Sequence, residues 1–248
     1  MTQPLGSNRD LRDEIRDYWS DRAATFDAEP GHKIGQGEEQ AAWQALVQKH
    51  LGSATGRRLL DLASGTGEIA RLCHDLGYAV TGLDWSEPML ERARAKVPAA
   101  VFMQSDAERT MLPDASFDVL VTRHLVWTLV DPAAAFAEWK RVLVPGGQLL
   151  LVDGDFVTRG WVARTLARLS PRRFQNMDSR HQDILSQVHF AQGARAEQVA
   201  FLLAEAGFTD IRIDTDLSKI HRAQARQLGW RRSLIRQSEH RYSISAKV

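Results

Sequence analysis

Residues 59–70, with the sequence LLDLASGTGEIA, constrain the fold of this chain more than any other stretch. An apolar run ends at Asp61 and Ala63, glycines follow at positions 65 and 67, and apolar residues then return at helical spacing. This order predicts a strand, a tight turn and a helix. Glycine lets the backbone approach a ligand closely, and a helix beginning near Gly67 presents unpaired N–H groups to an anionic group. The stretch therefore predicts a nucleotide-binding turn, although its glycine spacing also fits the dinucleotide fingerprint and a plain tight connection.

Acidic residues follow two further predicted strands. Residues 78–84 form an apolar run that ends in Asp84, and residues 100–104 form a short one followed by Asp106 and Ala107. In an open α/β sheet, ligands bind outside the carboxyl ends of the strands. The Asp84 carboxylate can accept both hydroxyls of a ribose, and Asp106 with the Ala107 N–H can contact an adenine edge. Asp84 can also cap the helix that begins near Ser86, and the two roles are compatible.

The rest of the chain alternates between apolar runs and helical patterns. Further strands are predicted at residues 117–122, 148–152, 209–214 and 241–247, helices at residues 132–143 and 196–206, and a turn at residues 145–147. Most of the strands are near-continuous apolar runs separated by helices, which favours a parallel sheet covered on both faces. We therefore predict an α/β fold with a Rossmann-like, seven-stranded, mainly parallel sheet whose last strand is antiparallel. Residues 1–248 are predicted to form a single domain.

The ordered motifs resemble those of the class I S-adenosylmethionine (SAM) dependent methyltransferases. The matching motifs are Asp61-x-Ala63-x-Gly65-Thr66-Gly67, Asp84, Asp106-Ala107, Phe117-Asp118-Val119 and Pro145-Gly146-Gly147, within residues 59–153. Within that superfamily the chain is most similar to small-molecule methyltransferases of the ubiquinone/menaquinone-biosynthesis type. Their N-terminal lid signature also appears here, as Tyr18-Trp19-x-x-Arg22-Ala23-x-x-Phe26-Asp27, with Phe26 where Tyr is common.

The resemblance implies SAM as the cofactor and a small molecule as the methyl acceptor. It implies that Gly65 and Gly67 pass under the methionine part, that Asp84 holds the ribose, and that Asp106 and Ala107 contact the adenine. It also implies a lid contact from Tyr18 and Arg22. The candidate cofactor-binding residues are Tyr18, Trp19, Arg22, Ala63, Ser64, Gly65, Gly67, Asp84, Trp85, Asp106, Ala107 and Arg123.

Two helical segments are predicted to enclose this site. Residues 1–51 form N-terminal lid helices, the first capped by Ser7 or Asn8 and running to about residue 28, the second spanning residues 38–51. Periodicity alone also allows the first helix to be packing without ligand contact. Residues 156–193 form a helical cap insertion rich in Arg and aromatic residues, at the place where the family puts the segment that covers its acceptor. Residues 219–236 form a basic helical segment.

The chemistry expected is in-line methyl transfer. The sulfonium supplies the leaving group, so the protein has to align a nucleophile at about 3 to 3.5 Å and exclude water. His124, just past the strand at residues 117–122, is the candidate base, because an imidazole titrates near neutral pH; a structural histidine is the alternative. Trp19, Trp127 and Trp161 can face a sulfonium or a cationic acceptor, although core packing is the commoner role. No metal is predicted, since the eight His form no short-spaced ligand pair and Cys73 is the one cysteine.

Other functions remain open at this point. The glycine pattern permits an NAD-dependent oxidoreductase, which Asp61, Asp106 and the antiparallel last strand disfavour. The basic stretch after Lys219 raises a nucleic-acid modifying enzyme, which the net charge of +1 disfavours. The chain can also bind SAM without turnover. Finally, SAM can react with itself: its amino group attacks the carbon next to sulfur, which closes a four-membered ring and releases methylthioadenosine.

Composition bounds the partners and the location. The first ten residues lack the order of a signal peptide, and no apolar run approaches the roughly 20 residues of a membrane span. The lone Cys73 is typical of a reducing compartment. We therefore expect a cytoplasmic monomer or homodimer of small-molecule biosynthesis, with no nucleic-acid or membrane partner.

Overall fold

The central sheet has the predicted Rossmann-like architecture. The computed structural model describes residues 10–29, 31–155, 179–226 and 240–248. Within them lies a seven-stranded sheet of order β3-β2-β1-β4-β5-β7-β6. Its strands are β1 (Arg58–Leu62), β2 (Ala79–Asp84), β3 (Val101–Gln104), β4 (Phe117–Arg123), β5 (Leu143–Asp155), β6 (Thr209–Asp214) and β7 (His240–Lys247). Strand β7 pairs antiparallel with both β5 and β6, and the other pairs are parallel, so the predicted fold class is confirmed.

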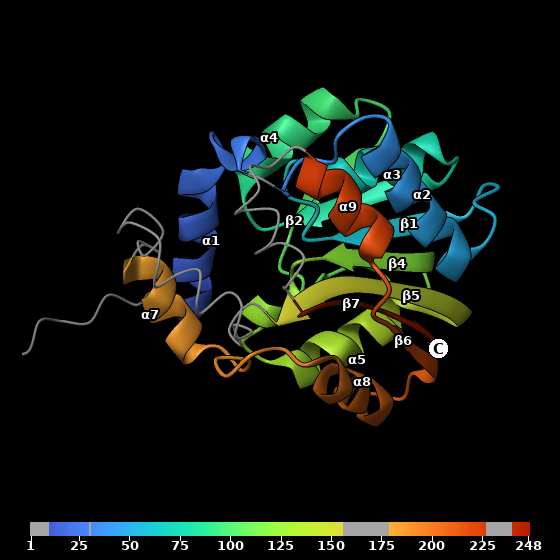
Figure 1. Ribbon diagram of the computed structural model, residues 1–248. Helices are drawn as coiled ribbons and strands as arrows, with labels where there is room; N and C mark the ends of the chain where they lie inside the picture. Colours follow the sequence, from blue (N-terminus) through green and yellow to red (C-terminus); the bar gives the residue numbers. More distant parts are fainter. Residues whose placement is uncertain (1–9, 30, 156–178, 227–239) are drawn as a thin grey trace, which may run out of the picture.

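Helices cover both faces of the sheet (Figure 1). The described helices are α1 (Leu11–Arg22), η1 (Phe26–Ala28), α2 (Glu38–Leu51), α3 (Glu68–Asp75), α4 (Glu87–Lys96), η2 (Val126–Thr128), α5 (Pro132–Val142), α7 (Ser179–Gln187), α8 (Ala196–Glu205) and α9 (Ser218–Arg226). Helices α5 and α8 pack on one face, and α2, α3, α4 and α9 lie over the other. Helices α1 and α7 pack against each other beyond the carboxyl ends of the parallel strands, where they border the site (Figure 1).

Strand periodicity explains the two hydrophobic cores. Successive side chains of a strand point to opposite faces, so Leu60 and Leu62 enter the core under α5 while Leu59 enters the core under α2 and α3. Trp139 of α5 and Trp43 of α2 are among the largest buried side chains of these two cores. The central strands are therefore apolar on both faces, as expected for a parallel sheet between two helical layers.

Several predicted boundaries are wrong, each for a local reason. The first helix is capped by Asp10, whose side chain accepts from Asp13 N–H, and not by Ser7 or Asn8. It ends at Arg22 instead of near residue 28, and a 3-10 turn follows, because tertiary contacts engage Asp27 (below). Ser86, not Asp84, caps α4.

The predicted turn at residues 145–147 lies inside β5. Pairing of β4 with β5 shifts from Phe117–Leu143 to Val119–Gln148, so these residues form an irregularity in a long strand. Helix α7 lies in the predicted cap insertion, but residues 156–178, including Trp161, fall outside the described residues, as do residues 227–239. The division of the chain into one domain with lid and cap stays a prediction.

The packing of α3 against α4 at Gly67 can be tested by substitution. Gly67 has φ +82°, and a Cβ there would lie 3.1 Å from both Cα and Cβ of Ala93 on α4, whereas a Cβ on Gly56, at φ +69°, would meet no atom within 4 Å. Both Ala substitutions should cost about 1 to 2 kcal/mol of backbone strain. Gly67→Ala should lose about 1 to 3 kcal/mol more because α3 and α4 are overpacked. Urea unfolding of both variants measures this, and equal losses would contradict the packing argument.

Candidate cofactor and active site

The glycine turn after β1 is fixed by backbone bonds. Ser64 N–H donates to Leu83 O at 2.9 Å, and Gly67 N–H donates to Ser64 O at 2.9 Å. Gly65 N–H donates to Oδ2 of Asp84 at 2.8 Å, which ties the turn to the end of β2. Ala63 and Gly65 both have φ of +53°, so the chain crosses the strand ends in a left-handed conformation before α3 begins. The turn therefore exposes backbone where a ligand can approach.

A cavity of about 530 Å³ lies over this turn. Its volume is within the range of small-molecule sites. The predicted residues that line it are Tyr18, Trp19, Arg22, Ala63, Ser64, Gly65, Asp84, Trp85, Asp106, Ala107, Arg123 and His124. Gly67 does not line it and instead lies beneath the turn against Ala93. The structure therefore brings the predicted residues together with that one exception.

Backbone N–H groups orient the acids at the ends of β2 and β3. Asp84 accepts from Gly65 N–H through Oδ2 and from Ser86 N–H through Oδ1, at 2.8 and 2.9 Å. Asp106 accepts from Glu108 N–H at 2.8 Å and lies 3.7 Å from the Arg12 guanidinium. Burial raises the pKa of both carboxyls above the ordinary value, although these N–H donors oppose the rise. Each carboxylate is thus held in one orientation while it lines the cavity.

Asp61 is a cavity residue that the sequence analysis did not place among the site residues. It is 1% exposed, and its Oδ2 has no hydrogen-bond partner among the described residues. Burial raises the pKa of Asp61 to about 8; the nearby Arg123 lowers it and Asp84 raises it further. The hydroxyl of Ser64 is likewise buried and has no hydrogen-bond partner among the residues that the structure describes. The position of Asp61 at the end of a buried strand was the available sequence signal.

These atoms fit SAM. A buried acceptor without a donor is costly, so a ligand that brings donors is the natural complement of the Asp61 and Ser64 oxygens. SAM carries ribose hydroxyls and an ammonium group, which are donors, and a positive charge that suits a site with several carboxylates. The hydrogen-bond acceptors of the cavity therefore match the donors of the cofactor implied by the motifs.

The lid residues line the cavity with their polar ends engaged. Tyr18 OH is 2.8 Å from Nδ1 of His181 on α7, and Arg22 pairs with Glu29. The Arg22 guanidinium also lies 5.3 Å from the centre of the Tyr18 ring. Contact of Arg22 with a cofactor carboxylate would therefore require it to exchange or share Glu29.

Aromatic side chains form one side of the cavity, and we call Tyr18, Trp19, Trp127 and His181 the aromatic wall. Their ring centres are 5.0 Å apart for Tyr18 and Trp19, 6.2 Å for Trp19 and Trp127, 5.5 Å for Trp127 and His181, and 5.3 Å for His181 and Tyr18. Each ring thus contacts the next in a closed set drawn from α1, η2 and α7. From the sequence, only Trp19 and Trp127 of this set were proposed to present their ring faces to a ligand. His181 was missed because it lies 163 residues from Tyr18, and no local pattern connects the two.

Phe26 and His32 were also missed as cavity residues. Their rings stack with centres 4.0 Å apart, and a Cβ built on Gly65 would lie 3.8 Å from the Phe26 ring, so Phe26 overlies the glycine turn. Nδ1 of His32 lies 3.0 Å from the Phe26 carbonyl, which can only accept, so the Nδ1–H form is favoured. Burial lowers the pKa of His32.

His124 sits in an unusual backbone conformation at the end of β4. Its φ is +61°, and its N–H donates to Val152 O at 3.0 Å. The following turn is held by Asp153, whose Oδ2 accepts from Val126 N–H at 2.8 Å; burial raises the pKa of Asp153 to about 7. A non-glycine residue with positive φ is uncommon and is enriched at functional sites. His124 and Trp127 therefore reach the cavity from a turn fixed by a buried carboxylate.

Within residues 10–29, 31–155, 179–226 and 240–248, no set of three His, Cys, Asp or Glu side chains is placed to hold a metal ion. None of the helices in those ranges combines the length and hydropathy of a bilayer-spanning segment.

Asp61 gives a pH-dependent prediction. Its pKa is about 8 in the folded protein against an ordinary 3.8, so the folded state keeps a proton that the unfolded chain loses. Stability should therefore fall as pH rises between these values, by up to about 1.4 kcal/mol per pH unit from this group. Asp61→Asn removes that slope: without SAM, urea unfolding should show a gain over the wild type at pH 8 that shrinks toward pH 5. A difference that is the same at both pH values would contradict the assignment.

Comparison with known proteins agrees with this geometry. Residues 60–151 match the family described as Methyltransferase domain. The chain is 27% identical over 226 residues to the demethylmenaquinone methyltransferase of Renibacterium salmoninarum, covering 85% of this chain and 92% of that protein. It is 34% identical over 137 residues to the phosphatidylethanolamine N-methyltransferase of Cereibacter sphaeroides, covering 53% and 66%.

A solved structure shares the fold. It is phosphoethanolamine N-methyltransferase 2 of Haemonchus contortus in complex with SAM, with a TM-score of 0.69 and 20% identity. The match covers 99% of this chain, which spans 61% of the length of the Haemonchus chain. On the family match, the relatives and this fold, the chain is a class I SAM-dependent methyltransferase similar to those of quinone biosynthesis.

Proposed function

We infer that the chain transfers the methyl group of SAM to a small, apolar, ring-containing acceptor. The observation that carries this inference is that one cavity is lined by two chemically different sets of residues. Carboxylates and backbone groups at the ends of β1, β2 and β3 suit a nucleoside, whereas the aromatic wall with Leu185 and Phe190 suits an apolar second molecule.

The nucleoside set would hold SAM. Asp84 binds the ribose hydroxyls, since each carboxylate oxygen has a second lone pair beyond the one used by Gly65 or Ser86 N–H. Asp106 and Ala107 contact the adenine. The methionine part lies beside Gly65 and Phe26, which both line the cavity, within reach of Tyr18 and Arg22. Asp61 then gains a cationic or hydrogen-bonding partner that compensates its burial.

The side chains around the second molecule would orient it and exclude water. SAM, when bound, supplies the electrophilic methyl group. Trp19, Trp127 and Phe26 close the reaction space to solvent, which strengthens the electrostatic contacts inside it. His124 takes the proton from the nucleophilic atom of the acceptor, as neutral imidazole can.

The acceptor class rests on the aromatic wall and on one relative. The wall offers ring faces for stacking, and the Renibacterium relative, of which this chain covers 92%, is named for a quinone substrate. The Cereibacter relative is named for an amine. Cations also bind aromatic faces, so an amine is the competing acceptor class in the experiment. No observation favours the self-reaction of SAM.

Product analysis tests the proposal. The purified protein is incubated with SAM alone, with a reduced naphthoquinone, and with phosphoethanolamine. S-adenosylhomocysteine (SAH) formed only with the quinol supports the proposal, and SAH formed only with the amine would move the acceptor class to amines. Methylthioadenosine formed from SAM alone, above the non-enzymatic rate, would replace methyl transfer with self-reaction.

The ribose contact is testable by calorimetry. Asp84→Ala should weaken SAM and SAH binding by about 1.5 to 3 kcal/mol, roughly ten- to hundredfold, because charged hydrogen bonds to the ribose are lost. Asp118→Ala is the matched control, since Asp118 pairs with Arg58 at the opposite end of β4 from the cavity. Unchanged SAM affinity in Asp84→Ala would rule out the assignment.

The role of His124 is testable once an acceptor is found. His124→Gln should lower kcat by about 10² to 10⁴, with SAM affinity within a few-fold of the wild type, because the proton acceptor is lost and the cofactor contacts remain. His74→Gln serves as the control, because His74 lies on α3 with its side chain 41% exposed and does not line the cavity. A kcat within twofold of the wild type would leave His124 a structural residue.

A further inference from the structure

Part of the cavity is built from the segment between α1 and α2, which holds the 3-10 turn η1, and we call residues 26–29 and 31–35 the strap. It follows α1 and contributes Phe26, Glu29, Gly31 and His32 to the cavity lining. Because Phe26 packs over Gly65, the strap covers the glycine turn and borders the place proposed for the methionine part of SAM. Its position therefore decides whether that end of the cavity is closed.

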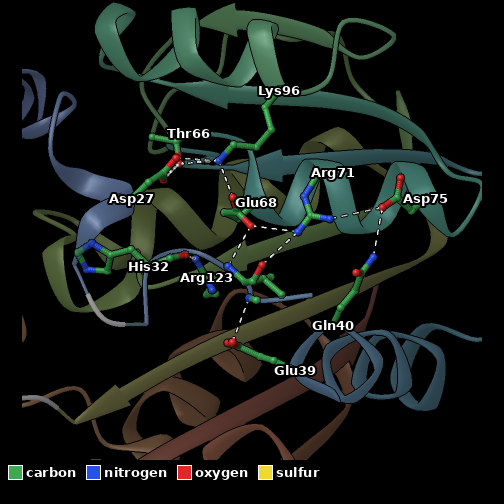
Figure 2. A network of polar contacts seen from close by, with 12 residues as sticks. Asp27, His32, Glu39, Gln40, Thr66, Glu68, Arg71, Asp75, Lys96 and Arg123 are labelled. Atoms are coloured by element: carbon green, nitrogen blue, oxygen red, sulfur yellow. Dashed lines mark hydrogen bonds and ion pairs between the residues drawn. The ribbon is translucent and has the colours of Figure 1, made fainter. Parts of the chain in front are cut away.

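Polar contacts hold the strap at several points (Figure 2). The Arg123 guanidinium donates to the His32 carbonyl, Gly35 N–H donates to Glu39 at 3.0 Å, and Ile34 N–H donates to Glu68 at 3.0 Å. Glu39 and Glu68 are each 3% exposed. The strap is thus bonded to both α2 and α3.

Lys96 connects the two ends of the strap. Its ammonium lies 3.0 Å from Oδ2 of Asp27, 3.3 Å from Oγ1 of Thr66 and 2.5 Å from Oε1 of Glu68 (Figure 2). Asp27 in turn accepts from the Thr66 hydroxyl at 2.5 Å, and Thr66 stands between the glycines of the turn. One cation therefore pairs both with a carboxylate of the strap and with the carboxylate that binds Ile34 N–H.

Charge and burial make these contacts consequential. The side chain of Lys96 is 19% exposed, and that of Glu68 is 3% exposed. Burial raises the pKa of Asp27 and of Glu68, but hydrogen bonds from Lys96 and neighbouring donors outweigh it and leave both below their ordinary values. Arg71 also pairs with Glu68, and Arg92 adds positive charge near Asp27. A partly buried carboxylate that loses its cation is destabilised, so the strap should loosen where Lys96 contacts it.

We propose that Lys96 is a positioning residue for the cofactor: by joining Asp27 and Glu68, it holds the strap closed over the methionine end of the SAM site. Lys96 is the last residue of α4, whose first turn, capped by Ser86, borders the cavity near Trp85. The same helix thus serves the nucleoside end through its N-terminus and the methionine end through its C-terminus. The proposal rests on the SAM placement given under the proposed function.

Comparison of SAH with methylthioadenosine isolates this role. Both ligands carry the adenosine, but methylthioadenosine lacks the amino-acid tail that the strap covers. Lys96→Met should lower SAH affinity about tenfold or more while methylthioadenosine affinity stays within about twofold of the wild type. Lys96→Arg should recover most of the loss. Trypsin cleavage after the exposed Lys33, with SAH present at saturation, should be faster in Lys96→Met.

Two controls separate positioning from general damage. Arg94 lies on the same helix as Lys96 and pairs with the exposed Glu87. Arg94→Met should leave the affinities for SAH and for methylthioadenosine unchanged. Asp27→Asn should weaken SAH binding in the wild-type background and add little in Lys96→Met, because the two residues act through one contact.

The outcomes that overturn the proposal are distinct from those that overturn the function. SAH affinity within twofold of the wild type in Lys96→Met, or equal losses for SAH and methylthioadenosine, would show that Lys96 does not position the strap. Wild-type protein that binds neither SAM nor SAH would instead contradict the proposed cofactor site.

Discussion

The hydrogen bond from Gly65 N–H to Asp84 is the contact on which the rest of the site depends. It joins the turn after β1 to the end of β2 at 2.8 Å, and it fixes one oxygen of the Asp84 carboxylate. The turn can take this path because Ala63, Gly65 and Gly67 all adopt positive φ. Helix α3 then begins directly at Glu68, so the segment that faces the ligand also starts the contacts to Lys96 and the strap. The turn at residues 63–67 thereby sets the positions of Asp84, Glu68 and helix α3.

Local patterns were sufficient to predict the sheet and the acids that follow strands β2 and β3. The strand, turn and helix at residues 59–70 follow from periodicity and glycine spacing, which act over a few residues, and the positions of the later strands along the chain follow the same rule. The strap, by contrast, is held by the ion pairs of Lys96 with Asp27 and Glu68. Lys96 lies 69 residues from Asp27 and 28 residues from Glu68 in the chain. Such pairs have no period and no local preference. The same contacts explain why a helix predicted to about residue 28 ends at Arg22.

Two residues with strained backbone lie at the edge of the sheet that carries the chemistry. Ala63 and His124, both with left-handed backbone, follow the neighbouring strands β1 and β4. Such conformations cost energy, and they persist only where surrounding contacts fix them. Ser64 N–H and His124 N–H donate to carbonyls of adjacent strands, and Asp153 holds the turn after His124. Sequence could identify His124 as a candidate base, but its conformation depends on a buried acid far along the chain.

The strand order has a consequence for how the chain is assembled. Strand β7 is the last described strand in sequence, yet it lies between β5 and β6. During synthesis the strands β3-β2-β1-β4-β5 can pair as they emerge from the ribosome, but β6 cannot join them until β7 has been made. Until then β5, a 13-residue strand with a largely apolar second half, keeps one edge without its neighbour. An open apolar edge invites pairing with other chains, so the interval before β7 inserts is when the nascent protein is most exposed to aggregation and most dependent on chaperones.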